Sequence, residues 1–213
     1  GDLYRRRADI IGFVNGIPLL FMELKNIHKD IRQAYEKNLA DYKDTVPHLF
    51  HHNAFIVLAN GSDARIGSLS VRFEHFHEWK RLEETEPGAV DMETLLKGIC
   101  DKRNFLDLFE NFILFDDSGG RTVKIIARNH QFLGVNRAIQ AVRDRKARLG
   151  RLGVFWHTQG AGKSYSMAFF TRKVHRKLGG NYTFLVLTDR DDLDTQIYKT
   201  FAGCRLVNHE KDP

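Results

Sequence analysis

A glycine-rich segment, His157-Thr-Gln-Gly-Ala-Gly-Lys-Ser164, limits the possible folds of this chain more strongly than any other. It matches the pattern Gly-x4-Gly-Lys-Ser/Thr at every position except the first, where His157 replaces glycine. The apolar run 152–156 predicts a strand before it, residues 163–178 predict a helix after it, and residues 184–188 predict a second strand. Strand, loop, helix and strand in this order predict a βαβ unit of a parallel sheet.

The chemistry of this segment fits a phosphate. Gly160 and Gly162, on either side of Ala161, allow backbone N–H groups to approach phosphate oxygens at a helix N-terminus. Lys163 would neutralise the β- and γ-phosphates, and the Ser164 hydroxyl would bind Mg²⁺. The alternative is a glycine-rich turn that only caps a helix.

Hydrolysis of ATP needs more than this loop. A motor of this kind requires a carboxylate pair at the end of a later strand, and no apolar run ending in Asp-Glu follows the loop. Asp191, Asp192 and Asp194 come after the second predicted strand, and we expect them in a loop. We therefore expect this chain to bind ATP without hydrolysing it.

A second candidate site lies near the start of the chain. Residues 8–24 form two β-rich runs around Asn15-Gly16, which predicts a hairpin. Asp9, Glu23 and Lys25 flank it as Asp, a 13-residue spacer and Glu-x-Lys. Two carboxylates can hold a divalent metal against a phosphodiester, and an ammonium can orient the attacking water.

The register of this hairpin decides whether these side chains can meet. With a two-residue turn Asp9 would pair with Met22, and Glu23 would point to the other face. A one-residue bulge, for which Gly12 is a plausible place, would bring the carboxylates together. Without such an irregularity the three residues are solvated charges at strand ends.

The remaining pattern predicts a small mixed α/β unit followed by helices. We expect a helix over 30–43, strands over 54–59 and 65–73, helices over 92–100 and 104–115, and a helix with a basic face over 131–149. The charged stretch 83–86 and Pro87-Gly88 mark the clearest change in composition. We place a domain boundary there, between residues 87 and 88.

The charge of the chain is concentrated in one tract. The net charge of +6 divides into −1 for residues 1–87 and +7 for 88–213, and residues 121–151 alone hold nine basic and one acidic side chain. This favours an anionic partner. No apolar stretch approaches the ~20 residues of a membrane span, and Cys100 and Cys204 show no metal-ligand or disulfide spacing. We expect no membrane partner and a cytoplasmic location.

Several segments together resemble type I restriction endonuclease R subunits, the earlier ones the nuclease domain of these subunits. They are Arg7-Ala-Asp9 through Glu23-Leu-Lys25, Tyr42 to Phe50, Asn53-Ala-Phe, Gly67-Ser, Asn111-Phe-Ile, Arg128-Asn-His-Gln131, Trp156 to Ser164 and Thr188 to Gln196. The resemblance implies an α/β fold in two parts. Residues 1–87 would be a mixed-sheet PD-(D/E)xK nuclease domain lacking its N-terminal part, and 88–213 would be linker helices and a truncated RecA-like parallel lobe of a superfamily 2 motor.

The resemblance also assigns roles in the nuclease part. Asp9, Glu23 and Lys25 would form the Mg²⁺-dependent nuclease site, with Ala8 in place of the proline of the motif name. Asn38 and Tyr42 would stand where such nucleases commonly carry Gln-x3-Tyr. The alternative for Tyr42 is a core aromatic residue.

In the motor part, Gln131 would stand where such motors place an adenine-reading glutamine, with Arg128 just before it. Its alternative is a surface glutamine on an amphipathic helix. Residues 188–196 would form the motif that touches the DNA backbone, or they are a plain strand-to-helix connection with an aspartate cap.

The function implied is that of the motor and nuclease subunit of a type I restriction–modification system. It would translocate double-stranded DNA with ATP and cleave both strands with Mg²⁺, together with methylation and specificity subunits. The alternatives are a helicase-associated nuclease of another repair or defence system, and an inactive fragment that only binds nucleotide or DNA.

Overall fold

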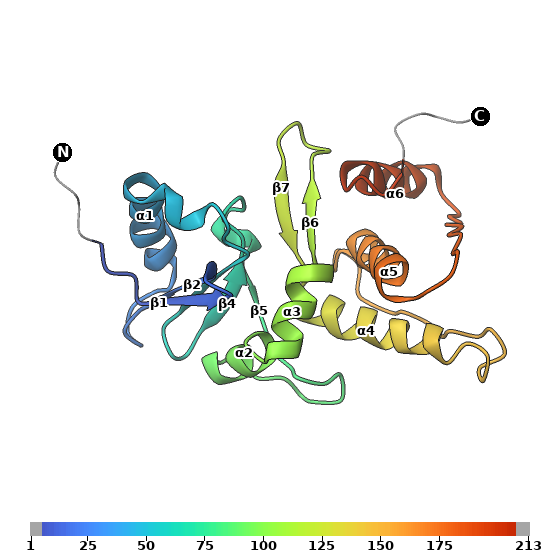
Figure 1. The fold of residues 1–213 in the computed structure, drawn as a ribbon, viewed down its shortest axis with the longest axis horizontal. Coiled ribbons are helices and arrows are strands. Elements are labelled where there is room, and N and C mark those ends of the chain that lie inside the picture. Colours follow the sequence, from blue (N-terminus) through green and yellow to red (C-terminus); the bar gives the residue numbers. More distant parts are fainter. Residues whose placement is uncertain (1–5, 208–213) are drawn as a thin grey trace. The chain divides into compact units, whose positions relative to one another are not determined.

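The computed structural model describes residues 6–207, and the chain forms two compact units that divide between Phe109 and Glu110 (Figure 1). The division lies after the sequence-based boundary at 87/88, because α2 (Met92–Ile99) and the start of α3 (Lys102–Asn111) pack within the first unit. The predicted α/β class with a mixed sheet is confirmed.

The first unit contains a five-stranded sheet in the order β1-β2-β3-β4-β5. Its strands are β1 (Ile10–Val14), β2 (Ile17–Leu24), β3 (Phe55–Ala59), β4 (Ala64–Gly67) and β5 (His77–Glu78). Only the β2–β3 pair is parallel, and the other three pairs are antiparallel. The apolar strand β3 is buried at every position, as expected for a central strand covered on both faces.

Helices cover both faces of this sheet. A π-helical turn (Ala34–Leu39) runs into α1 (Ala40–Thr45), and its apolar side chains pack on Phe21, Ile56 and Leu58. A short 3-10 turn (Pro47–Phe50) follows. On the other face the ring of Phe105 from α3 contacts Phe55 edge to face at 5.3 Å. The strand alternation therefore directs the odd residues of β2 towards α1.

Local chemistry explains how α2 is placed. Asp91 precedes the helix, and its carboxylate accepts a hydrogen bond of 2.6 Å from the Thr94 N–H, which satisfies one free donor of the first turn. Gly98 lies directly against Trp79, and a Cβ at this position would fall 2.0 Å from the indole nitrogen. Only glycine permits this close approach.

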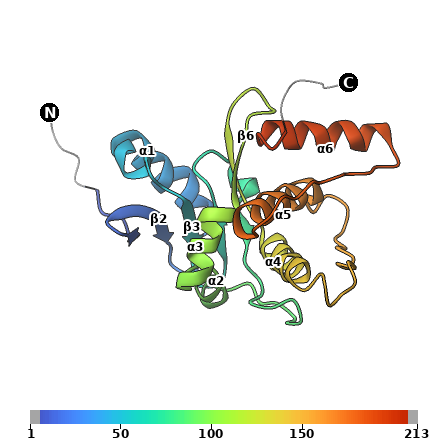
Figure 2. The same cartoon turned by 45° about the vertical axis from the view of Figure 1, so that its right-hand side comes forward.

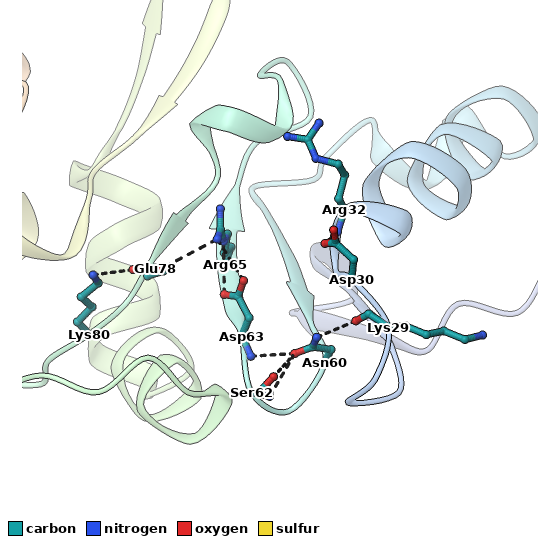
Figure 3. A network of polar contacts seen from close by, with 9 residues as sticks. All are labelled: Lys29, Asp30, Arg32, Asn60, Ser62, Asp63, Arg65, Glu78 and Lys80. Atoms are coloured by element: carbon teal, nitrogen blue, oxygen red, sulfur yellow. Dashed lines mark hydrogen bonds and ion pairs between the residues drawn. The ribbon is translucent and has the colours of Figure 1, made fainter.

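A polar network fixes the ends of β3 and β4 (Figure 3). The Asn60 side chain accepts hydrogen bonds from Ser62 and from the Asp63 N–H, and it donates one of 2.7 Å to the Lys29 carbonyl oxygen. Arg65 pairs with Asp63 at 3.1 Å and lies 3.9 Å from Glu78. The network ties the segment that follows β2 to the β3–β4 turn.

The second unit contains a two-stranded antiparallel sheet and three helices. Strands β6 (Ile113–Asp116) and β7 (Val123–Ile126) form a hairpin. Helix α5 (Lys163–Lys177) lies between α4 (Asn129–Arg143) and α6 (Asp191–Gly203), as both cartoons show (Figure 2). The ring of Phe112 packs on Phe132 at 4.8 Å and on Phe169 at 5.6 Å.

The expected parallel βαβ unit is absent from the described part of this unit. Residues 152–156 and 184–188 are irregular rather than strands, and their apolar side chains are largely exposed, with Val154 at 93% and Leu187 at 83%. A strand exists only when neighbouring strands satisfy its backbone groups, and no described strand pairs with either segment. The sequence showed their β propensity but not the partners they need.

Other boundaries also differ from the sequence-based expectation. The helix expected over 104–115 ends at Asn111, and 113–116 is strand β6 instead. The helix expected over 131–149 ends at Arg143 and is followed by turns with positive φ at Leu149 and Gly150. The acidic residues 191–194 lie in the first turn of α6, not in a loop, where their charge complements the helix dipole. The strand expected over 65–73 is limited to β4.

Within residues 6–207, no helix is both long enough and apolar enough to span a lipid bilayer.

Candidate functional site

The β1–β2 hairpin contains the register shift on which the first site depends. Val14 pairs with Ile17 and Phe13 with Pro18, whereas Gly12 pairs with Leu20, so Leu19 is an extra residue on β2. The predicted bulge beside Gly12 is confirmed, although the additional residue belongs to the opposite strand. The shifted register places Asp9, just before β1, opposite Glu23 rather than Met22.

The three predicted nuclease residues accordingly lie together. The Asp9 carboxylate accepts a hydrogen bond of 2.8 Å from the Leu24 N–H. Lys25 Nζ donates to Glu23 Oε1 at 2.8 Å, and both side chains are largely buried. Asp9 is exposed and Glu23 is buried, so solvent reaches the site from the side of Asp9.

Glu23 is held in an unusual environment for a carboxylate. Burial raises its pKa above 4.5, the Lys25 ammonium opposes that shift, and the negative charge of Asp9 adds to it. Its second oxygen, Oε2, is buried and has no hydrogen-bond partner among residues 6–207. A buried, unpaired carboxylate oxygen costs free energy, and a cation at that oxygen would offset this cost.

Tyr42 reaches the same site from α1. It is buried, its hydroxyl donates to the Arg7 carbonyl oxygen, and its ring contacts Phe21 edge to face at 5.3 Å. Burial raises the pKa of Tyr42, and the negative charges of Glu23 and Asp9 raise it further. Tyr42 is therefore both a core aromatic residue and a neighbour of the carboxylates.

Asn38 is less well placed. It is half-buried in the π-helical turn before α1, and it makes no side-chain hydrogen bond within the described residues. The structure brings together Asp9, Glu23, Lys25 and Tyr42, and within the described residues no side-chain hydrogen bond joins Asn38 to them.

The glycine-rich loop of the second unit shows the backbone geometry that its sequence demands. Gly160 and Gly162 have φ values of +78° and +79°, a region that other residues rarely adopt. Gly162 is the N-cap of α5, so Lys163 and Ser164 open the helix. His157 is not among the described residues with positive φ, which explains why a side chain is tolerated there.

Lys163 and Ser164 lie at this helix N-terminus as predicted. Lys163 Nζ donates to the His157 carbonyl oxygen at 2.8 Å and, more weakly, to that of Thr158 at 3.4 Å. Ser164 is half-buried in the first turn, and Ala161 lies between the two glycines. Lys163 thus closes the loop onto its own backbone.

Gln131 lies against the loop from the start of α4. Its Oε1 accepts from the Arg128 N–H at 2.9 Å, and its Nε2 donates to the Gly162 carbonyl oxygen at 2.9 Å. The side chain is 3% exposed, so the alternative of a surface glutamine is wrong. Arg128 is the exposed N-cap residue of α4.

One contact was not anticipated from the sequence. His130 Nε2 lies 3.0 Å from the Ala161 carbonyl oxygen, and its ring meets that of His157 edge to face at 4.6 Å. Its position between Arg128 and Gln131 in Arg-Asn-His-Gln was the only available signal.

The segment after the second predicted strand borders a separate polar pocket of about 350 Å³. Asp192, Thr195 and Gln196 of α6 contribute to it, together with Asp116 and Tyr165. The Tyr165 hydroxyl donates to Asp116. Burial raises the pKa of Tyr165, and the hydrogen bond to the Asp116 carboxylate raises it further. Asp192 of α6 therefore lines a pocket to which no residue of the phosphate loop contributes.

Among residues 6–207, no group of three or more His, Cys, Asp or Glu side chains has the arrangement of a complete metal site. Asp9 and Glu23 supply two carboxylates, so the remaining ligands of a metal there would be water, backbone or substrate oxygens.

Comparison with known proteins gives two family matches. Residues 2–75 match the family model described as type I restriction enzyme R protein N terminus, and residues 130–212 match the SWI2/SNF2 ATPase model. The first match contains the hairpin carboxylates and Tyr42. The second begins at His130 and contains the whole glycine-rich loop.

Curated relatives align with nearly the entire chain. The type I restriction enzyme HindI endonuclease subunit of Haemophilus influenzae is 41% identical over 93% of this chain, and the putative MjaIXP endonuclease subunit of Methanocaldococcus jannaschii is 30% identical over 93%. The SsaAORF53P endonuclease subunit of Staphylococcus saprophyticus is 24% identical over 94%. The chain spans about one fifth of the length of these relatives. With both family matches in the order of the chain, it belongs to the family of type I restriction enzyme endonuclease subunits.

Proposed function

We propose that this chain is the part of a type I restriction subunit that combines a DNA-cleaving site with the start of an ATP-driven motor. The observation that carries the proposal is the convergence of Asp9, Glu23 and Lys25, which depends on a specific bulge in the hairpin. Relatives that carry similar sequence over both units are named as endonuclease subunits of restriction enzymes. This favours the restriction system over a helicase-associated nuclease of another kind.

The residues of the first unit fit a divalent metal. Glu23 Oε2 is buried without a partner, and the Asp9 carboxylate lies on the neighbouring strand with one oxygen held by the Leu24 N–H. We propose that Asp9 and Glu23 hold Mg²⁺. Bound Mg²⁺ would supply charge stabilisation for a phosphodiester and lower the pKa of its bound water.

The other side chains of the site would position this chemistry. Lys25 is fixed by Glu23 and can orient the attacking water through its remaining N–H donors. Tyr42 anchors the chain before β1 through the Arg7 carbonyl oxygen and so fixes Asp9. We retain Asn38 as a weaker candidate because of its place in the Asn-x3-Tyr pattern.

In the second unit we propose a site for ATP and Mg²⁺. Gly160, Ala161 and Gly162 would present backbone amides to the phosphates, Lys163 would exchange its two carbonyl partners for phosphate oxygens, and Ser164 would bind Mg²⁺. Gln131 lies against the loop, and Arg128 is the N-cap residue of the same helix; we propose that both contact the nucleotide.

We further propose that 152–156 and 184–188 become strands of a RecA-like parallel sheet when the remaining part of the motor lobe is present. Their exposed apolar side chains are unusual for irregular segments and fit buried parallel strands. The proposed subunit would act in the cytoplasm on double-stranded DNA together with methylation and specificity subunits.

The test uses the full-length subunit assembled with its partner subunits on DNA that carries the recognition site. We expect Mg²⁺-dependent cleavage that requires ATP. Lys25→Ala should abolish cleavage and leave ATP-driven translocation at the wild-type rate, because Lys25 belongs to the first unit only. Lys29→Ala is the matched control, since its exposed side chain lies outside the Glu23 pair. Unchanged cutting by Lys25→Ala would disprove the assignment of the site.

A further inference from the structure

The start of α4 is bonded to the phosphate loop through two successive residues. His130 Nε2 meets the carbonyl oxygen of Ala161 at 3.0 Å, and Gln131 Nε2 donates to that of Gly162 at 2.9 Å. A carbonyl oxygen only accepts hydrogen bonds, so His130 must carry its proton on Nε2. Two adjacent side chains thus hold two adjacent peptide groups of the loop.

Holding these carbonyl groups also orients the amides that would meet a phosphate. In a trans peptide the C=O of one residue and the N–H of the next point in opposite directions. Fixing the carbonyls of Ala161 and Gly162 therefore directs the N–H groups of Gly162 and Lys163 away from α4. Neither N–H has a backbone hydrogen-bond partner within the described residues, as is usual for the first donors of a helix.

His130 contacts the loop at two of its residues. Beyond Ala161, its ring lies edge to face against His157, the residue at the first position of the loop. The carbonyl oxygen of His157 in turn accepts from Lys163 Nζ. Burial lowers the pKa of His130; the hydrogen bond to Ala161 opposes this shift and the charge of Arg128 adds to it, so the net direction favours the neutral ring, which donates without adding a charge.

We propose that His130 is a positioning residue of the phosphate loop, which orients the Gly162 and Lys163 amides towards the phosphates of a nucleoside triphosphate. This rests on the proposed ATP site and adds to it a residue outside the glycine-rich segment. His130 acts on the phosphates through the Ala161 peptide group and makes no contact with the base.

The test compares variants that keep the ring with variants that keep the donor. His130→Phe retains an aromatic ring against His157 but loses the N–H, whereas His130→Gln restores an N–H at a similar reach. His175→Phe, at an exposed histidine in the last turn of α5, is the matched control. Affinities for Mg·ATP and for adenosine are measured by competition against a fluorescent nucleotide, and thermal unfolding checks the fold of each variant.

We expect His130→Phe to weaken ATP binding about tenfold, a change of about 1.4 kcal/mol, while the affinity for adenosine stays within twofold. His130→Gln should recover most of the lost ATP affinity, and His175→Phe should match the wild type. Equal losses for ATP and adenosine, or wild-type ATP affinity in His130→Phe, would overturn the proposal for His130 alone. Absence of ATP binding by the wild-type chain would overturn the proposed nucleotide site as well.

If His130→Phe does not fold, His130→Gln decides the question. Its ratio of ATP to adenosine affinity should equal that of the wild type, and a ratio lowered tenfold in this donor-retaining variant would contradict the proposal.

Discussion

At the scale of single residues, Glu23 differs most from what its sequence position suggests. A glutamate at a strand end is usually solvated, yet here it is 3% exposed and shares one oxygen with Lys25 while the other has no partner in the described structure. Its raised pKa has a definite consequence for stability. Protonation of Glu23 stabilises the fold fully below 4.5, and this contribution is lost as the pH rises through the folded-state pKa.

A metal bound by ionised Glu23 should therefore stabilise the protein more as the pH increases. We expect the rise in Tm caused by Mn²⁺ or Mg²⁺ to grow as the pH rises from 4.5 through the folded-state pKa of Glu23 and then to level off, because one pH unit below that pKa costs about tenfold in metal affinity. Thermal unfolding with and without metal measures this. Glu23→Gln should show no metal-dependent shift at any pH, and an equal shift in both proteins would contradict the assignment.

Residue chemistry was predictable where one short segment carried the whole signal. The spacing of Asp9, Glu23 and Lys25 and the Gly-Ala-Gly-Lys-Ser segment were legible in the sequence. The burial of Gln131 and the contact of His130 with Ala161 were not, because both depend on α4 lying against a loop some 30 positions away in the chain.

At the scale of elements, the two glycines of the phosphate loop are not equivalent. Both have positive φ, but a Cβ at Gly160 would meet open space, whereas a Cβ at Gly162 would lie 2.9 Å from Gln131 Nε2. Gly162 is therefore required by its backbone and by its neighbour together. Its place as the N-cap of α5 links the conformation of the loop to the start of the helix.

Gly162→Ala should consequently weaken nucleotide binding. A non-glycine residue in this conformation costs about 1–3 kcal/mol, and displacing Gln131 removes a hydrogen bond to the loop. We expect a loss of about tenfold or more in ATP affinity, measured by calorimetry. Gly179→Ala, at a site with open space and no positive φ, should bind as the wild type. Equal affinities for the Gly162 variant and the wild type would show that the loop conformation is unrelated to binding.

Elements defined by local pattern were predicted better than those defined by distant pairing. The Asn15-Gly16 hairpin followed from turn chemistry alone, whereas its bulge was only the condition under which Asp9 and Glu23 could meet. Strand β6 was assigned to a helix because Phe105, Leu108 and Phe112 continue a helical spacing up to it, and its pairing with β7 lies beyond the reach of that pattern.

At the scale of the whole chain, the positive charge gathers in one stretch. Arg143, Arg145, Lys146 and Arg148 lie at the end of α4 and in the turns after it, and all four are exposed. The simplest explanation is that they form a solvent-exposed charged surface at the end of a helix. If they bind the phosphates of a duplex, each phosphate contact releases counterions from the DNA. Each such contact steepens the fall of log affinity with log salt concentration by about 0.9.

We expect neutralisation of these four side chains to glutamine to lower that slope by about 2–4 and to weaken binding of double-stranded DNA uniformly across sequences. Fluorescence anisotropy at several salt concentrations measures both effects. A matched variant replaces four exposed lysines of the first unit, Lys37, Lys43, Lys97 and Lys102, and should retain the wild-type slope. If both variants lower the slope equally, the four basic side chains contribute only through the net charge of the protein and not through specific contacts with DNA.

Because Leu19 is an extra residue on β2, the approach of Asp9 to Glu23 depends on the alignment of β1 with β2. Slipping β1 against β2 by one position would keep an antiparallel ladder and much of the hydrogen bonding, yet it would turn Glu23 away from Asp9. Because the same slip would also exchange the two faces of β1, the packing of this strand and the approach of Asp9 to Glu23 depend on one alignment. Gain or loss of a single residue in this hairpin would therefore separate the two carboxylates of the proposed metal site, although neither of them is itself replaced.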